Sequence, residues 1–217
     1  MDYNLNKFEE LYDILPNGLI HQKKIINDIK KYDLDYVNTR YNSYGEQCDM
    51  ISFLRYGYLI GVINKIPESI LDIGYGNCSF LKICKKTIKN CYGNDVSGYP
   101  IPQNVFFIDD ITQDHYDVIS FFDVLEHFED INIIKKLKCN YIYISVPECH
   151  FHSKEWFFNW KHRRPDEHLW HFNLKSITEF FKSNGFDLIS SSNIEDIIRK
   201  PTDENTNILS CVFKKMK

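Results

Sequence analysis

The 217-residue sequence contains no alanine, no Cys-x-x-Cys pair and no apolar run near the roughly 20 residues that cross a bilayer. No membrane span is therefore expected. The seven cysteines are odd in number and lack paired spacing, which argues against a disulfide framework and against a thiolate zinc site. We expect them to be reduced and to pack as small hydrophobic residues. The missing alanine, beside abundant Asn, Ile and Lys, indicates AT-rich coding and says nothing about chemistry.

A strong charge of one sign is also missing. The formal net charge is −4, so an extended nucleic-acid surface is not expected. The opening segment MDYNLNKFEEL is acidic and polar, unlike a signal peptide. A hydrophobic fraction of 43% is ample for the core of one domain. We therefore expect a cytosolic protein with one domain; nothing in the sequence predicts its oligomeric state.

The first part of the chain, residues 1–66, is predicted to form a helical cap that belongs to the same domain as residues 67–217. Apolar residues recur at helical spacing in three segments of this cap, at residues 8–15, 19–32 and 46–66. The breaker Pro16-Asn17-Gly18 separates the first two segments, and Pro67 ends the third.

From residue 69 onward, short β-rich runs alternate with helical stretches, which is typical of βαβ units and a mainly parallel sheet. The expected strands are residues 69–73, 91–95, 105–109, 116–122 and 140–146. The expected helices are residues 79–89, 130–138 and 174–184, the last ending at Gly185. Residues 186–192 and 207–213 are predicted to form a closing antiparallel pair. The fold class is α/β.

A glycine-containing turn follows the first of these strands, in the stretch LDIGYGNC. Gly74 and Gly76 let the backbone turn sharply and approach a ligand closely. A dinucleotide fingerprint would need a third glycine where Ser79 stands, which disfavours an NAD-dependent oxidoreductase. Asp72, two positions before Gly74, instead fits a turn that binds S-adenosylmethionine (SAM).

Acidic residues also follow the next three predicted strands. Asp95 lies 21 residues after Gly74, where a carboxylate can accept hydrogen bonds from both ribose hydroxyls of a nucleotide. Asp110 can accept from an adenine amino group, with Ile111 packed on the ring, and Asp123 ends the fourth strand. Carboxyl ends of parallel strands share one sheet edge, so these side chains are predicted to line one ligand site.

Together, the ordered segments LDIGYGN, YGNDV, IDDIT, FFDVLEHFED and ISVP resemble the motif series of class I SAM-dependent methyltransferases. The similarity covers residues 69–213 and is greatest to the ubiquinone-biosynthesis type and its phage or viral relatives. It implies a Rossmann-like, doubly wound sheet of seven strands in the order 3-2-1-4-5-7-6, with strand 7 antiparallel. It also implies SAM as cofactor and S-adenosylhomocysteine as product.

The resemblance assigns roles to particular residues. Asp72, Gly74 and Gly76 would surround the methionine moiety, Asp95 would hold the ribose, and Asp110 with Ile111 the adenine. Three further residues inside the motifs, Tyr75, Val96 and Phe122, would also contact the cofactor. In the cap, Tyr41 and Tyr44 are candidates to close over the cofactor and Arg55 to reach its carboxylate. The sequence departs from the family at Cys78, where a third glycine is usual; this could tighten the turn or narrow the pocket.

Residues 147–173 hold all three tryptophans and five of the eight histidines, and should arch over the same sheet edge. Aromatic side chains there can exclude water and face the sulfonium cation. His150 is the first candidate for a general base that deprotonates an acceptor hydroxyl, followed by His168 and His171. Asp123 is a carboxylate alternative. Each of these histidines can equally be a structural hydrogen-bonding group.

Other polar residues are assigned less directly. Glu126-His127 is expected to pack or to brace the loop. The basic residues Lys161, Arg163 and Arg164 either bind a phosphate or carboxylate of the acceptor or form a solvated rim. Imidazole and oxygen ligands are present, so a histidine metal site stays open as an alternative, but the sequence does not predict its geometry and no metal ligand is assigned.

The function predicted from sequence is methyl transfer from SAM to a hydroxyl or amine of a small polar acceptor, such as a sugar or glycan precursor. Two alternatives remain open at this point. One is an RNA methyltransferase acting on a cap or a tRNA, supported only by residues 161–164. The other is a non-catalytic interaction protein that retains the SAM fold.

Overall fold

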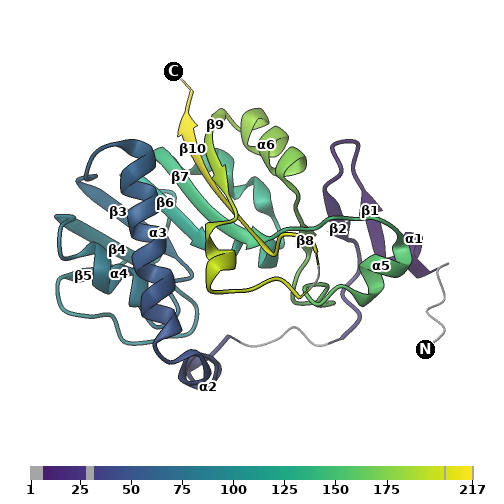
Figure 1. Cartoon of the computed structure of the whole chain (residues 1–217). Coiled ribbons are helices and arrows are strands. Elements are labelled where there is room, and N and C mark those ends of the chain that lie inside the picture. The colour runs from purple at the N-terminus through teal and green to yellow at the C-terminus, as the bar shows by residue number, and fades with distance from the viewer. Residues whose placement is uncertain (1–6, 28–31, 203, 217) are drawn as a thin grey trace.

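A seven-stranded mixed sheet forms the centre of the computed structural model (Figure 1), which describes residues 7–27, 32–202 and 204–216, without the side chains of residues 40–44. The strands run in the order β5-β4-β3-β6-β7-β10-β9. Their bounds are β3 (Ser69–Ile73), β4 (Asn90–Asn94), β5 (Val105–Phe107), β6 (His115–Phe122), β7 (Lys138–Pro147), β9 (Phe186–Ser192) and β10 (Ile208–Lys215). Strand β10 runs antiparallel to both of its neighbours, β7 and β9, and the other pairings within this sheet are parallel. The predicted strand order and antiparallel seventh strand are confirmed.

Both faces of this sheet are buried, which explains why its central strands are nearly continuous apolar runs. One face, with Ile70 and Val118, packs against α3 (Gln47–Ile63) and α4 (Ser79–Cys84). The other face packs against α6 (Leu174–Ser183), where Phe181 stacks on Phe213 with ring centroids 4.1 Å apart. Helices on both faces make the fold doubly wound.

The local sequence explains where α6 begins and where α3 ends. Helix α6 begins at a capping box, in which Asn173 Oδ1 accepts from the Ser176 amide and Ser176 Oγ accepts from the Asn173 amide. Helix α3 ends at Ile63, where Asn64 caps it in a left-handed conformation three residues before Pro67. The predicted helix at residues 130–138 is instead the short 3-10 helix η3 (Ile131–Lys136).

The prediction that residues 1–66 are helical is wrong for the start of the chain. Among the described residues, the short helix α1 (Phe8–Leu11) is followed by β1 (Tyr12–Ile14) and β2 (Ile20–Gln22), and helices return with α2 (Leu34–Tyr44) and α3. Strand β2 pairs on its other edge with β8 (Trp170–His171), so β1, β2 and β8 form a second, three-stranded sheet. The partner strand lies far along the sequence, and this pairing overrides the local helical spacing.

The small sheet carries its own apolar cluster beside the main one. Phe8 and Tyr12 pack there against Phe157 and Phe158 of α5 (Lys154–Asn159). Figure 1 shows α1, β1, β2 and α5 together at the end of the molecule where the N-terminus lies. Thus residues 7–22 support the aromatic segment that follows β7 and do not cover the glycine turn.

The expectations for the cysteines and for membrane spans can be compared with the structure. The seven cysteines, all within the described residues, are free thiols, and six of them are buried. Among the described residues, no helix has the length and apolar character that a membrane crossing requires.

Candidate active site

The turn after β3 has the backbone shape that the sequence predicts for a ligand-binding loop. Gly74 has φ +72°, and its amide donates to the Asn94 carbonyl at 2.7 Å. A Cβ at this position would lie 2.2 Å from Val124 Cγ2, so only glycine fits. Cys78 has φ 61°, a left-handed conformation that glycine adopts more easily. Its thiol is fully buried and does not line the cleft described next, so Cys78 preserves the turn without narrowing the site.

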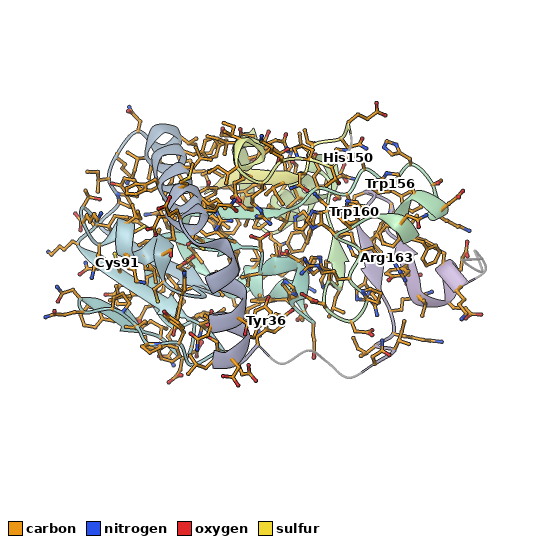
Figure 2. All side chains as sticks on the ribbon, turned by 60° about the horizontal axis from the view of Figure 1, so that its bottom comes forward. Tyr36, Cys91, His150, Trp156, Trp160 and Arg163 are labelled. Carbon is orange, nitrogen blue, oxygen red and sulfur yellow. The ribbon has the colours of Figure 1, made fainter. Side chains whose placement is uncertain are left out.

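A cleft of about 760 Å³ opens beyond the carboxyl ends of β3, β4 and β6. One end, which we call the glycine end, is lined by Asp72, Gly74, Tyr75, Gly76, Asp95, Val96 and Phe122. The other end, the histidine end, is lined by Glu126, His127, Lys161, His162, Arg164, His168, Arg199 and Lys200. Helix α2 contributes Tyr36 to the wall, and Figure 2 shows Tyr36 apart from the group of His150, Trp156, Trp160 and Arg163. The side chain of Tyr41 lies outside the described residues.

Two carboxylates at the glycine end are held in place by neighbours. Asp72 is buried and accepts a hydrogen bond from Ser120 Oγ at 2.7 Å, and burial raises the pKa of Asp72 to about 7. Asp95 accepts from the Gly76 amide at 2.8 Å and from the Ser97 amide at 2.7 Å. The carboxylate of Asp95 thereby joins the glycine turn to the loop after β4, beside the cleft.

The two residues assigned to adenine, Asp110 and Ile111, do not line the cleft in this structure. The exposed Asp110 carboxylate accepts from its own turn, from the Thr112 amide at 2.9 Å and the Thr112 hydroxyl at 2.6 Å. Ile111 packs against the core on the α6 side of the sheet. Their adenine contact stays a prediction from the resemblance.

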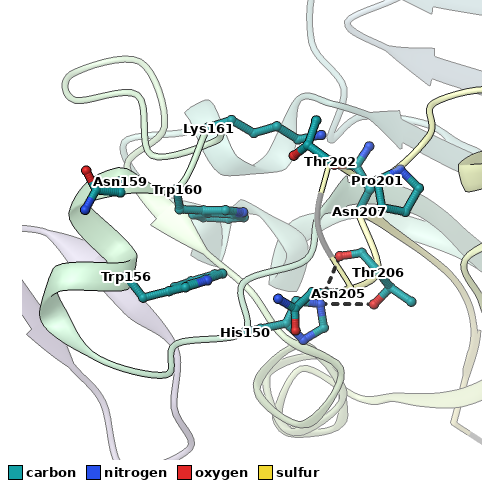
Figure 3. Close-up of a pocket in the computed structure, with 10 residues that line it drawn as sticks. All are labelled: His150, Trp156, Asn159, Trp160, Lys161, Pro201, Thr202, Asn205, Thr206 and Asn207. Carbon is teal, nitrogen blue, oxygen red and sulfur yellow. Dashed lines mark hydrogen bonds between the residues drawn. The ribbon is translucent and has the colours of Figure 1, made fainter.

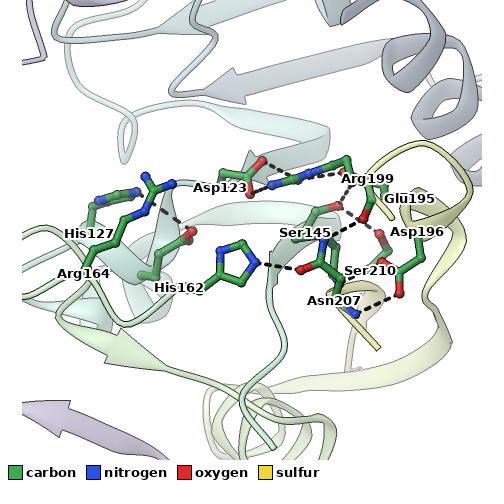
Figure 4. A network of polar contacts seen from close by, with 12 residues as sticks. Asp123, His127, Ser145, His162, Arg164, Glu195, Asp196, Arg199, Asn207 and Ser210 are labelled. Atoms are coloured by element: carbon green, nitrogen blue, oxygen red, sulfur yellow. Dashed lines mark hydrogen bonds and ion pairs between the residues drawn. The ribbon is translucent and has the colours of Figure 1, made fainter. Parts of the chain in front are cut away.

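Arg55 and Asp123 belong to a charged network that closes one wall of the cleft. Figure 4 shows Asp123, Arg199 and Glu195 of this network. Arg55 donates to Glu195 through Nε at 2.7 Å and through a terminal nitrogen at 2.9 Å, and it lies 4.2 Å from the centroid of the Phe122 ring. Arg199 donates to Asp123 at 2.8 Å from each terminal nitrogen and to Glu195 at 3.0 Å. Arg55 lines the cleft while its guanidinium binds Glu195, and its contact with the cofactor carboxylate stays a prediction.

This network removes Asp123 as a general base. Burial alone would raise the pKa of Asp123, but the charges of Arg199 and Arg55 outweigh it, and the pKa is lowered overall. A carboxylate so strongly paired is a poor proton acceptor. Glu195 and Arg199 lie between the two predicted closing strands, residues 186–192 and 207–213, in a segment to which the sequence assigned no role. Their i, i+4 spacing is the signal that was available.

His150, the first candidate for the base, does not reach the cleft. It lines a separate pocket of about 250 Å³, the tryptophan pocket, with Trp156 and Trp160 (Figure 3). Its Nε2 donates to the Thr206 carbonyl at 2.9 Å, a bond that fixes its orientation. Lys161 and Asn207 line both cavities, so the tryptophan pocket adjoins the histidine end of the cleft. The role predicted for His150 is therefore not supported by its position.

The two other candidate histidines differ in position. His168 is buried and lines the cleft, and burial lowers its pKa well below the usual value, which keeps its imidazole neutral. His171 is buried in the apolar cluster beside Phe157, with ring centroids 4.9 Å apart, and does not line the cleft.

Glu126 and His127 lie beside His168, on the short 3-10 helix η2 (Leu125–His127). His127 Nδ1 lies 2.6 Å from the Glu167 carbonyl and 2.9 Å from the Tyr32 hydroxyl, which confirms its bracing role. Glu126 is 1% exposed, and within the described part of the chain neither of its carboxylate oxygens has a hydrogen-bond partner. Ligand atoms of Glu126, His127 and His168 all lie within 4.8 Å of one another, a set that could hold a metal ion.

The basic cluster at residues 161–164 does not form one exposed patch. Arg163 lies over the Phe158 ring at 4.6 Å, and Arg164 pairs with Glu167 at 3.0 Å. Lys161 alone of the three lines both cavities. This arrangement removes the one sequence feature that supported an RNA substrate.

Comparison with known proteins now defines the class. Residues 46–191 match a family described as a methyltransferase domain, and the chain belongs to that family. Together with its glycine turn, this makes the protein a SAM-dependent methyltransferase of class I. Among proteins of curated function, none matches the sequence significantly.

Solved structures confirm the fold at low sequence identity. The 1,6-didemethyltoxoflavin-N1-methyltransferase of Burkholderia thailandensis, solved with its substrate and S-adenosylhomocysteine, is 12% identical; the match covers 95% of this chain and 99% of that one, with a TM-score of 0.58. The magnesium protoporphyrin IX methyltransferase of Synechocystis PCC 6803, solved with S-adenosylhomocysteine, is 14% identical. The match covers 85% of this chain and 96% of that one, with a TM-score of 0.59. A putative methyltransferase, solved in complex with the Haloferax volcanii Trm112 activator, is 14% identical. The match covers 88% of this chain and 100% of that one, with a TM-score of 0.61.

Proposed function

We propose that this methyltransferase transfers the methyl group of SAM to a hydroxyl or amine of a small polar acceptor bound at the histidine end of the cleft. One observation carries the proposal: a single cleft runs from the glycine turn to a wall of histidines and cations. Its volume of about 760 Å³ lies in the range of small-molecule sites. Donor and acceptor can therefore lie in line within one cavity, as a displacement at a sulfonium requires.

At the glycine end, the chain offers a matching set of groups for the cofactor. Asp72 presents a carboxylate to the cationic methionine moiety, and Asp95 can accept from the ribose hydroxyls. The aromatic face of Phe122, already covered by Arg55, lies in the same wall and helps to exclude water.

At the histidine end, the neutral imidazole of His168 is the proton acceptor we assign, in place of His150 and Asp123. Lys161, Arg164 and Arg199 supply cations in the same wall, which suits an acceptor with hydroxyl, phosphate or carboxylate groups. A sugar or glycan precursor has such groups. Two of the solved structures named above belong to methyltransferases named for other small molecules, magnesium protoporphyrin IX and 1,6-didemethyltoxoflavin, which supports the size of the acceptor and not its identity.

Calorimetry with SAM and with S-adenosylhomocysteine tests the proposal. We expect binding of both at micromolar concentrations, weakened at least tenfold by Asp95→Ala and unchanged by Asp114→Ala, which removes an exposed carboxylate elsewhere. No binding of either ligand would refute it. Tight binding without turnover on a broad acceptor panel would favour the non-catalytic alternative, and a steep salt dependence of RNA binding would favour the RNA alternative.

Three finer expectations stay predictions from the sequence. They are a cytosolic location, a place among the ubiquinone-biosynthesis-type methyltransferases, and a phage or viral origin.

A further inference from the structure

Glu126 is the most unusual group in the cleft because it is a buried carboxyl group with no hydrogen-bond partner among the described residues. Buried polar groups are almost always paired, since an unpaired one loses its hydration without compensation. A carboxyl group in this position therefore needs a partner that the described residues do not supply, and a cation is the partner that suits it.

Two imidazoles flank this carboxyl group. The His127 ring lies edge-on to the His168 ring, with centroids 4.7 Å apart, and His127 Nε2 lies 3.9 Å from Glu126 Oε1. The Glu167 carbonyl can only accept, so the short contact at 2.6 Å assigns the proton of His127 to Nδ1. The lone pair of His127 is then on Nε2, the nitrogen that faces Glu126. A backbone carbonyl that fixes the tautomer in this way is the usual second partner of a metal-binding histidine.

The two segments that carry these side chains are joined firmly. The Leu169 amide donates to the Glu126 carbonyl at 2.8 Å, and the His168 amide donates to the Arg164 carbonyl at 2.8 Å. Arg164 also pairs with Glu167 at 3.0 Å. The three candidate ligands are therefore held together by the fold and do not depend on a mobile loop.

We infer that Glu126, His127 and His168 bind a divalent metal ion at the histidine end of the cleft, and that this ion holds an oxygen atom of the acceptor. The second half of the inference rests on the proposed function and narrows the acceptor to a hydroxyl compound. Two imidazoles with one carboxylate suit zinc and the other first-row transition metals better than calcium or magnesium. Three protein ligands leave coordination positions open towards the cleft.

The metal would supply Lewis-acid chemistry, which makes a bound hydroxyl group easier to deprotonate. With the ion bound, His168 would serve as a ligand and would no longer be the proton acceptor assigned above. The chain's own residues orient the acceptor. Lys161 and Arg199 line the wall beside the cluster, while Asp123 is kept out of it by its two bonds to Arg199. The three ligand atoms already lie within 4.8 Å of one another. Since bonds from nitrogen or oxygen to such a metal are near 2.1 Å, small side-chain rotations are enough to bring all three atoms to bonding distance from one ion.

Cobalt(II) is a suitable probe, because its visible absorption reports imidazole ligation without any acceptor. Protein stripped with a chelator should bind one Co²⁺ per chain, and Zn²⁺ should displace it while Mg²⁺ should not. Glu126→Gln and His168→Asn should each weaken Co²⁺ binding by at least tenfold. His162→Asn removes another buried histidine of the same cleft, one that bonds to Asn207, and should leave Co²⁺ binding unchanged.

Thermal unfolding without metal checks that each variant folds, and added Zn²⁺ should raise the melting temperature of the wild type and of His162→Asn only. Absence of Co²⁺ binding at millimolar concentration, or equal binding by wild type, Glu126→Gln and His168→Asn, would overturn the inference. Calorimetry of SAM on the metal-free protein separates the two proposals. SAM binding without Co²⁺ binding would leave the proposed function standing and remove only the metal site.

Discussion

The Arg199 guanidinium binds the Asp123 carboxylate with both terminal nitrogens, each 2.8 Å from an oxygen. Asp123 follows β6 at the centre of the sheet, and Arg199 lies near η4 (Ile194–Ile197), in the segment that connects β9 to β10. The pair thus fixes that segment against the cleft, with the fully buried Glu195 between two arginines.

Replacement of Glu195 should destabilise the protein strongly. Glu195→Gln leaves Arg55 and Arg199 close together with one carboxylate fewer, and we expect a loss of about 3 kcal/mol in the free energy of unfolding. Urea denaturation measures this loss, with the exposed Glu179→Gln as a control that should stay within about 0.5 kcal/mol of wild type.

The two arginines lower the pKa of Glu195. The contribution of Glu195 to the free energy of unfolding is therefore present above pH 4.5 and is lost as the pH falls through the folded-state pKa. Glu195→Gln should therefore lose less stability than wild type on acidification below pH 5.

SAM should bind more tightly as the pH rises. The pKa of Asp72 in the free protein is about 7, and a cationic ligand group beside the carboxylate would lower it. Binding then releases a proton, so affinity should increase roughly tenfold between pH 6 and pH 8. Calorimetry in two buffers of different ionisation enthalpy detects this proton. A pH dependence that persists in Asp72→Asn would show that another group is responsible.

Gly74→Ala should damage both the fold and the site. The new Cβ would meet Val124 at 2.2 Å and would also occupy a left-handed backbone, for a combined cost of roughly 2–4 kcal/mol. Gly57→Ala is the matched control, since Gly57 lies exposed in α3 with no atom within 4 Å of an added Cβ. It should stabilise the protein by roughly 0.5–1 kcal/mol. Similar melting curves for the two variants would contradict this account of the turn.

Cys78 should tolerate replacement by the glycine that related methyltransferases usually have there. Cys78→Gly relieves the left-handed conformation but loses a buried thiol, so stability should stay within about 1 kcal/mol of wild type and SAM affinity should not fall. Cys78→Val places a branched side chain in the same buried, left-handed position and should cost more than about 2 kcal/mol. If Cys78→Gly abolished SAM binding, the thiol would have a role that its burial does not suggest.

The sheet was predictable because its signals are local. Strand β3 has the predicted bounds, residues 69–73, and strand β9 has the predicted bounds, residues 186–192. Buried strands produce short apolar runs, and glycine or aspartate marks their ends. The glycine end of the cleft follows from the same signals, because parallel strands bring Asp72 and Asp95 to one edge.

The histidine end was not predictable in the same way. His150 and His168 look equivalent in sequence, but β7 ends in a direction that sends His150 to the tryptophan pocket, while the Arg164–Glu167 turn carries His168 into the cleft. Glu195 reaches its partners only because η4, the segment after β9, packs against β10 and α3. Such placements depend on long-range packing, which local spacing does not record.

The pairing of β2 with β8 has a consequence for how this enzyme can diverge. The start of the chain and the aromatic segment after β7 form one unit that is largely separate from the seven-stranded sheet. Changes in either half of that unit can reshape the wall around the acceptor, while the strands that carry the glycine turn remain untouched. Selection can thus alter what is methylated without altering how the methyl donor is held, and the first strands of the chain are as open to that selection as the residues that touch the acceptor.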